Sequence, residues 1–168
     1  MQSLTIFDHV AMHPFLANLP AGWQQRLAVH ASPVMRPVGR RLFREGGSAD
    51  RFWLLQSGDV ALDFHVPGRG DVVIEHIGAG GVLGWSWLFA PCRWTLGGIV
   101  AQDCRALQFD AAAVRALIDE DPALGRELMT RFVAVVAGRL QAARQRLADL
   151  YAYPADVSGP ADPASRDQ

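Results

Sequence analysis

Three of the five tryptophans lie in one short segment of the sequence, from Gly84 to Thr95, together with one arginine, Arg93. Indole rings offer large apolar surfaces, and a guanidinium group pairs with a carboxylate or a phosphate. This combination predicts a pocket for a flat or apolar ligand with one acidic group, which Arg93 would face. The alternative is that the rings pack together and fill the interior of the domain. The candidate ligand-binding residues are Gly84, Trp85, Ser86, Trp87, Leu88, Arg93, Trp94 and Thr95.

Residues that could support catalysis or bind a metal ion show no informative spacing. The five histidines, at positions 9, 13, 30, 65 and 76, are scattered along the chain, and we expect no zinc site. Cys92 and Cys104 are too few for a disulfide scaffold or an all-cysteine iron–sulfur cluster. They are either small buried side chains or, if the fold brings them together, a redox pair. With no nucleophile elbow, phosphate-binding loop or carboxylate pair in the sequence, we expect neither an enzyme nor a bound cofactor.

The elements that must position these residues are predicted to be strands. Between residues 34 and 109, short apolar alternations are separated by glycines at intervals of about eight to twelve residues, which is typical of an antiparallel sandwich or barrel. Residues 67–71, with the sequence Pro-Gly-Arg-Gly-Asp, predict a hairpin turn. Glycines 46, 47 and 58 are expected to supply turn conformations. Val60, Leu62 and Phe64 are expected to share one face of a half-buried strand.

Helices are predicted on both sides of this β-region. Residues 15–30 predict one short helix, opened by Asn18 or Pro20, because apolar residues recur there at helical spacing. After the strands, Asp110 is expected to cap a helix over residues 111–118.

The longest helix is predicted from Pro122 to about Tyr151, with Asp121 as its cap. Its apolar residues alternate steps of four and three, which is the pattern of a two-stranded coiled coil. We therefore expect a homodimer; the alternative is an amphipathic helix that packs on its own domain. The expected interface consists of Met129, Val133, Val136, Leu140, Ala143, Leu147 and Leu150.

Length and charge limit the class of protein. We expect one domain over residues 1–152 and a disordered tail over residues 153–168, which are rich in Pro, Asp, Ser, Ala and Gly. A formal net charge of −1 gives no basic field for a phosphate backbone. No apolar run approaches the roughly 20 residues of a membrane span, and the N-terminus lacks the features of a secretory signal. We therefore expect a cytoplasmic protein without membrane contact.

The order of helix, strands, short helix and long helix resembles the effector domain of the Crp/Fnr family and other cyclic nucleotide-binding domains. Three segments carry the resemblance: residues 42–60, with the Gly-Gly-Ser-Ala-Asp run before an aromatic strand; residues 77–84, with the sequence Ile-Gly-Ala-Gly-Gly-Val-Leu-Gly; and residues 110–151. The resemblance covers about residues 13–151. It implies an eight-stranded jelly roll with flanking helices and a dimerisation helix.

The resemblance also implies that residues 84–95 are the ligand cassette. In family members that bind cyclic nucleotides, a glutamate after the cassette glycine holds the ribose hydroxyl, and an arginine holds the cyclic phosphate. Here Trp85 stands in place of the glutamate and cannot accept a hydrogen bond. Arg93 lies near the place of the arginine, although in a slightly different register Thr95 would take it. We therefore expect weak or absent binding of cyclic AMP.

These observations favour a regulatory homodimer that binds a small effector other than cyclic AMP. The alternatives are a protein-interaction module with a vestigial pocket, a cyclic nucleotide binder with an altered site, and a haem sensor that uses His76 with Met129 or Cys92. The partner would be a small effector or a regulatory protein. Because the sequence ends about 17 residues after Tyr151, too few for a helix-turn-helix domain, we expect no direct sequence-specific DNA binding.

Overall fold

The computed structural model describes residues 3–152 of the chain. The tail predicted over residues 153–168 lies outside the described residues. In chain order the elements are α1 (Ile6–Met12), α2 (Ala21–Ala28), β1 (Ala31–Arg36), β2 (Arg41–Phe43), β3 (Arg51–Val66), β4 (Gly70–Gly78), β5 (Val82–Leu83), the 3-10 helix η1 (Ser86–Leu88), β6 (Gly97–Asp110), α3 (Ala111–Glu120) and α4 (Pro122–Ala152).

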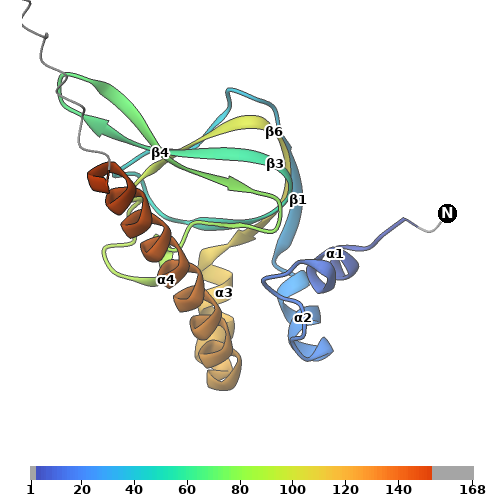
Figure 1. The fold of residues 1–168 in the computed structure, drawn as a ribbon. Coiled ribbons are helices and arrows are strands. Elements are labelled where there is room, and N and C mark those ends of the chain that lie inside the picture. Colours follow the sequence, from blue (N-terminus) through green and yellow to red (C-terminus); the bar gives the residue numbers. More distant parts are fainter. Residues whose placement is uncertain (1–2, 153–168) are drawn as a thin grey trace, which may run out of the picture. The chain divides into compact units, whose positions relative to one another are not determined.

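The strands form one antiparallel sheet that curls into a roll, so the predicted jelly roll is confirmed (Figure 1). Its main path runs β1–β6–β3–β4, with β2 paired to β6 and β5 paired to β3. The described residues form six strands and not the eight that the resemblance implies. The difference lies in β3 and β6, which have 16 and 14 residues. The pairing between them shifts register around residues 55–60, and a bulge of this kind bends a strand without ending it.

The turn predictions are mostly confirmed. A short turn joins β3 to β4 where the hairpin was predicted. Gly46 and Gly58 have φ values of 79° and 86°, a region that favours glycine. Gly47 differs, because its φ is not positive. A Cβ atom there would lie 3.1 Å from the carbonyl oxygen of Arg44, so close packing disfavours a larger residue at this position.

The prediction that β3 is half-buried is wrong for its centre. Val60 and Leu62 are buried as expected, but Ala61 and Asp63, which point to the opposite face, are buried as well. Asp63 is compensated by the Arg41 guanidinium, with a nitrogen–oxygen distance of 2.7 Å. The strand is therefore covered on both faces.

The N-terminal helices differ from the single helix predicted over residues 15–30. Asn18 adopts a left-handed conformation (φ 65°) and Pro20 lies directly before α2, so this helix covers only Ala21–Ala28. A further helix, α1, precedes it. The side chain of Thr5 accepts a hydrogen bond from the Asp8 backbone, and the Asp8 side chain accepts one from the Thr5 backbone. This reciprocal capping box was the sequence signal for α1 that the prediction missed.

The two C-terminal helices are confirmed. The Asp110 side chain accepts a hydrogen bond from Ala113 N and caps α3, and the Asp121 side chain accepts one from Leu124 N and caps α4. The chain divides into two compact units, the first ending at Phe132 and the second beginning at Val133.

The environment of α4 changes at that boundary. Its buried residues, Leu124, Gly125, Leu128 and Phe132, all belong to the first unit. None of the described residues from Val133 to the end of the helix is buried. No helix among residues 3–152 is both long enough and apolar enough to cross a membrane.

Candidate functional site

The cassette, residues 84–95, connects β5 to β6 and is held by the loop that follows β2. The Gly46 amide donates to the Trp94 carbonyl at 2.8 Å, and the Trp94 amide donates to the Gly47 carbonyl at 2.8 Å. The Ala49 amide donates to the Cys92 carbonyl, also at 2.8 Å. Main-chain hydrogen bonds therefore bring together two segments that carry the family resemblance, the Gly-Gly-Ser-Ala run over residues 46–49 and the cassette.

Trp87 is part of the core. Its side chain is 0% exposed. The ring stacks on Phe52 with centroids 5.1 Å apart and an interplanar angle of 11°, and it meets Phe132 edge to face at 5.5 Å. The indole N–H donates to the carbonyl of Gly84 at 3.2 Å, so its polar group is also satisfied. This ring is enclosed by protein and presents no face to a ligand.

Trp94 is buried in a second aromatic cluster. Its ring lies 4.4 Å from Phe43 and 6.0 Å from Trp53 between centroids. Phe52, the partner of Trp87, and Trp53 are consecutive residues of β3, and consecutive side chains of a strand point to opposite faces. The two cassette rings therefore pack on opposite sides of β3 and do not line one cavity.

The other candidate residues are more accessible. Trp85 and Leu88 are half-buried, Thr95 and Arg93 are exposed, and Ser86 is buried. The Arg93 guanidinium donates to the carbonyl of Gly46 at 2.9 Å.

The backbone at Gly84 passes close to the Trp94 ring. It has a φ of 88°, and a Cβ atom there would lie 2.9 Å from that ring. Only glycine lets the chain pass this closely.

Main-chain amides of the cassette are already used within the domain. Leu88 N and Phe89 N donate within the 3-10 helix, and Cys92 N donates to the carbonyl of Phe89 at 2.8 Å. With Trp94 N donating to Gly47, four amides in this segment are committed to protein acceptors. An anion would have to displace these hydrogen bonds in order to use these amides.

Arg115, on α3, is a residue of the site that the sequence analysis missed. Its guanidinium donates to the Trp87 carbonyl at 2.7 Å and approaches the Cys92 sulfur at 3.5 Å. Because Arg115 is 28 residues from Trp87 in sequence, no local sequence pattern predicts this contact. Both cysteines are free thiols, Cys92 half-buried and Cys104 buried.

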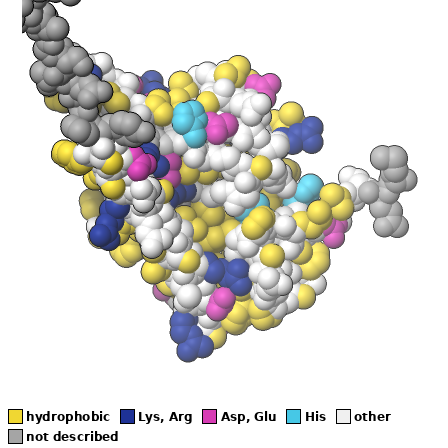
Figure 2. Space-filling view, viewed as in Figure 1, with side chains coloured by type: hydrophobic (Ala, Val, Ile, Leu, Met, Phe, Trp, Pro, Cys, Tyr) yellow, Lys and Arg dark blue, Asp and Glu magenta, His cyan; other side chains and the backbone are white. Residues whose placement is uncertain are grey.

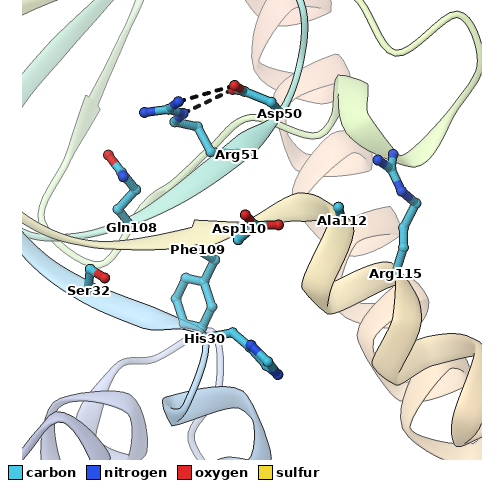
Figure 3. Close-up of a pocket in the computed structure, with 9 residues that line it drawn as sticks. All are labelled: His30, Ser32, Asp50, Arg51, Gln108, Phe109, Asp110, Ala112 and Arg115. Atoms are coloured by element: carbon cyan, nitrogen blue, oxygen red, sulfur yellow. Dashed lines mark hydrogen bonds and ion pairs between the residues drawn. The ribbon is translucent and has the colours of Figure 1, made fainter.

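Three cavities of the first unit have no cassette residue in their lining. One of about 340 Å³ lies where β1, β3, β6 and α3 meet, and Figure 3 shows Arg51 paired there with Asp50. Another, of about 230 Å³, lies beside Cys104, and a third, of about 270 Å³, lies beside Arg41 and Asp63. The lining of the cavity beside Arg51 contains two acidic residues, Asp50 and Asp110, and two arginines, Arg51 and Arg115, so these formal charges cancel.

The histidines occupy structural positions. His13 is buried, its Nε2 lies 2.9 Å from the Leu55 carbonyl, and its Nδ1 accepts from Phe15 N at 3.2 Å. Burial lowers the pKa of His13 below the usual value, opposed by the hydrogen bond to Leu55. His76 pairs with Asp59 at 2.5 Å. Within residues 3–152, no cluster of three or more His, Cys, Asp or Glu side chains could hold a metal ion.

The predicted interface residues from Val133 onward lie on α4 outside the buried core. Val133, Leu140, Leu147 and Leu150 are 54–73% exposed, whereas Met129, Val136 and Ala143 are half-buried. Hydrophobic atoms remain visible along this part of α4, beside basic side chains (Figure 2). Val133 and the three leucines of the predicted seam are therefore presented to solvent.

Comparison with known proteins places these features in a family. The family model for the cyclic nucleotide-binding domain matches residues 36–121, which are about half of the chain. The CRP-like cAMP-activated global transcriptional regulator of Mycobacterium tuberculosis is 28% identical over 124 residues, which are 74% of this chain and 54% of that protein. The chain thus spans about half the length of this curated relative.

Two solved structures have the same fold. A cyclic nucleotide-binding domain from Methylobacillus flagellatus KT aligns with a TM-score of 0.71 and 17% identity, over 90% of this chain and 83% of that one. The catabolite activator protein of Thermus thermophilus aligns with a TM-score of 0.64 and 21% identity, over 82% of this chain and 63% of that one. The roll, the cassette between β5 and β6 and the sequence match agree, and the chain belongs to the cyclic nucleotide-binding domain family.

Proposed function

We propose that this chain is a regulatory domain whose output is a homodimer formed through α4, and that it does not hold a cyclic nucleotide in the way the family motif implies. The observation that carries the proposal is the cassette, in which Trp87 and Trp94 are core residues on opposite faces of β3. The role is regulatory and not catalytic.

The case against ordinary nucleotide binding rests on the chemistry of the cassette. A ribose hydroxyl needs an acceptor, and the Trp85 indole has none. A buried phosphate needs several donors, but four cassette amides and Arg93 already donate to protein carbonyls. The loss of one charge-assisted hydrogen bond costs about 2 kcal/mol, or roughly thirtyfold in affinity.

The case for the dimer rests on α4. An exposed stripe of Val133, Leu140, Leu147 and Leu150 repeats at the spacing of a two-stranded coiled coil. Burial of such a leucine against a second helix contributes about 2 kcal/mol. A second copy of the same helix offers a matching stripe.

A second candidate is an effector that contacts Trp85 and Arg93, with an apolar body and one acidic group. It is favoured because Trp85 is half-buried without a ring partner among the described residues, and the exposed Arg93 follows in the same segment. Such a ligand would use the edge of the cassette and not the enclosed Trp87. If no effector binds, the domain is an interaction module with a vestigial pocket.

Calorimetric titration of the full chain with cyclic AMP and cyclic GMP tests the nucleotide part of the proposal. We expect no binding tighter than about 1 μM, and a dissociation constant well below that value would overturn it. Tryptophan fluorescence with a panel of aromatic and fatty acids then tests the second candidate. A response that Trp85→Phe and Arg93→Ala both weaken would support an effector site, and the absence of any response would leave the interaction module.

A further inference from the structure

His13 is a buried histidine whose two ring nitrogens are used in opposite ways. It directly follows α1 and is 4% exposed. The amide of Phe15 donates to its Nδ1 at 3.2 Å, so Nδ1 carries no proton. Its Nε2 lies 2.9 Å from the carbonyl oxygen of Leu55 in β3, and only a protonated nitrogen can donate to that oxygen. These two partners require the neutral ring, in the form that carries its proton on Nε2.

The Leu55 carbonyl joins this histidine to a further segment of the roll. It also accepts a hydrogen bond from the amide of Gly80, in the turn between β4 and β5, at 2.8 Å. A Cβ atom at Gly80 would lie 3.5 Å from Pro14 Cγ, so the residue after His13 lies over the same turn. The end of α1, β3 and this turn therefore meet around one carbonyl oxygen.

The residues that follow His13 contact the first part of α4. The Arg131 guanidinium donates to the carbonyls of Phe15 and Ala17 at 2.9 and 3.1 Å. The Phe15 ring meets the Phe132 ring edge to face, with centroids 4.8 Å apart. The Ala17 amide donates to the His13 carbonyl at 2.8 Å, so the turn that makes these contacts begins at the histidine. This turn therefore connects the buried ring to α4.

Protonation of His13 is incompatible with this arrangement. A doubly protonated imidazole is a donor at both nitrogens, so its Nδ1 would direct a proton at the N–H of Phe15. Burial lowers the pKa of His13, and the hydrogen bond to the Leu55 carbonyl opposes this effect. The closed turn therefore keeps the ring neutral below the ordinary histidine pKa.

The neighbouring elements bring few titratable or charged groups to His13. Within residues 3–152, both hydrogen-bond partners of its ring are main-chain groups. α1 contributes His9, one helical turn earlier, which is hydrogen-bonded to an uncharged side chain of β3. α2 approaches the turn with the uncharged Gln24. α4 contributes Arg131 and Glu127, which pair with each other at 3.1 Å, so the acid there is already matched.

We propose that His13 is a proton-operated latch, which holds residues 13–17 on β3 and α4 while the ring is neutral and releases them at mildly acidic pH. The latch does not depend on the proposed homodimer. A released ring takes up a proton near the ordinary pKa of about 6.5, so at about pH 5.5 roughly ten of every eleven released rings are charged. The turn should then open about tenfold more often than at about pH 7.5. On opening, Arg131 and Phe132 lose their contacts with the turn, which carries the change to α4.

Hydrogen–deuterium exchange of the full chain, followed by mass spectrometry, tests the proposal. Exchange at about pH 7.5 and 5.5 is compared as protection factors, which correct for the intrinsic pH dependence of amide exchange. A peptide over residues 13–20 reports the turn, and a peptide within β6 reports global unfolding. We expect protection of residues 13–20 to fall by about tenfold at the lower pH, and to stay well below that of β6 at both.

Two results in the wild type would overturn the latch. One is equal protection of residues 13–20 at the two pH values. The other is a segment 13–20 that is as protected as β6, because the turn would then open only when the whole domain unfolds.

Two variants identify the group that is responsible. His13→Gln keeps a side-chain donor for the Leu55 carbonyl but takes up no proton, so the tenfold pH effect should disappear even where protection is lower at both pH values. His9→Gln is the matched control, because it removes a half-buried histidine one helical turn away, and it should retain the effect. A pH effect that persists in His13→Gln contradicts the proposal, and so does its loss in His9→Gln.

Discussion

The cassette and the second half of α4 both concentrate apolar side chains, but only the cassette buries any of them. In residues 84–95, Trp87 and Trp94 are 0% and 6% exposed and pack against aromatic residues of the roll. Beyond Phe132, the leucines of α4 are more than half exposed. The cassette therefore contributes two rings to the core, although its Phe89 is 60% exposed, whereas this part of α4 buries none of its apolar side chains.

The difference comes from the number of neighbouring elements. The cassette lies beside β3, whose two faces each offer an aromatic partner, so each tryptophan finds its own ring. After residue 132, no side chain of α4 is buried in its own unit. Residue type alone does not distinguish a ligand pocket from a core or an interface.

Truncation of a cassette ring should produce the largest loss of stability. Trp87→Ala removes a fully enclosed ring and leaves a cavity, so we expect the free energy of unfolding to fall by about 4 kcal/mol. Urea denaturation at one fixed protein concentration measures this loss.

The matched control is Trp85→Ala, in the same cassette. Trp85 is half-buried, so its removal should cost about 1 kcal/mol. Equal losses for the two variants would contradict the assignment of Trp87 to the core.

A smaller effect should appear with pH, and it should belong to the first unit alone. Burial lowers the pKa of His13, so the folded state keeps the ring neutral while the unfolded chain takes up a proton near the ordinary histidine pKa of about 6.5. The stability that depends on neutral His13 is complete above that pH and is lost as the pH falls below it.

Urea denaturation between about pH 7.5 and pH 5.5 tests this dependence. His13→Gln should lower stability at neutral pH by about 1–2 kcal/mol and flatten the decline toward acid. An identical slope in wild type and variant would show that another group causes the decline.

Much of the fold follows from local sequence signals. The hairpin turn, the caps at Asp110 and Asp121 and the span of α4 depend on residues close together in the chain, and each was predicted. The errors also have local causes. The short helix begins directly after Pro20, one of its two predicted starts, but residues 15–20 lie outside it, and the capping box of Thr5 and Asp8 was overlooked.

The candidate site was less predictable because its contacts are long-range. The sequence identified the aromatic cassette but not which ring would meet which face of β3. Arg115 contacts the cassette from α3, and residues 46–49 hold it from the loop after β2. Neither contact has a sequence signature of its own. The apolar repeat of α4 was visible in the sequence because a helical repeat is local.

The central claim is that the cassette is closed and the α4 seam is the working surface of the domain. Its most direct test is sedimentation velocity on wild type, Leu140→Glu/Leu147→Glu, and the matched control Gln141→Glu/Ala148→Glu, which places both carboxylates on the outer face of the helix. We predict a dimer for wild type and control, and a folded monomer for the leucine variant. A monomeric wild type, or a leucine variant that remains a dimer, would contradict the account.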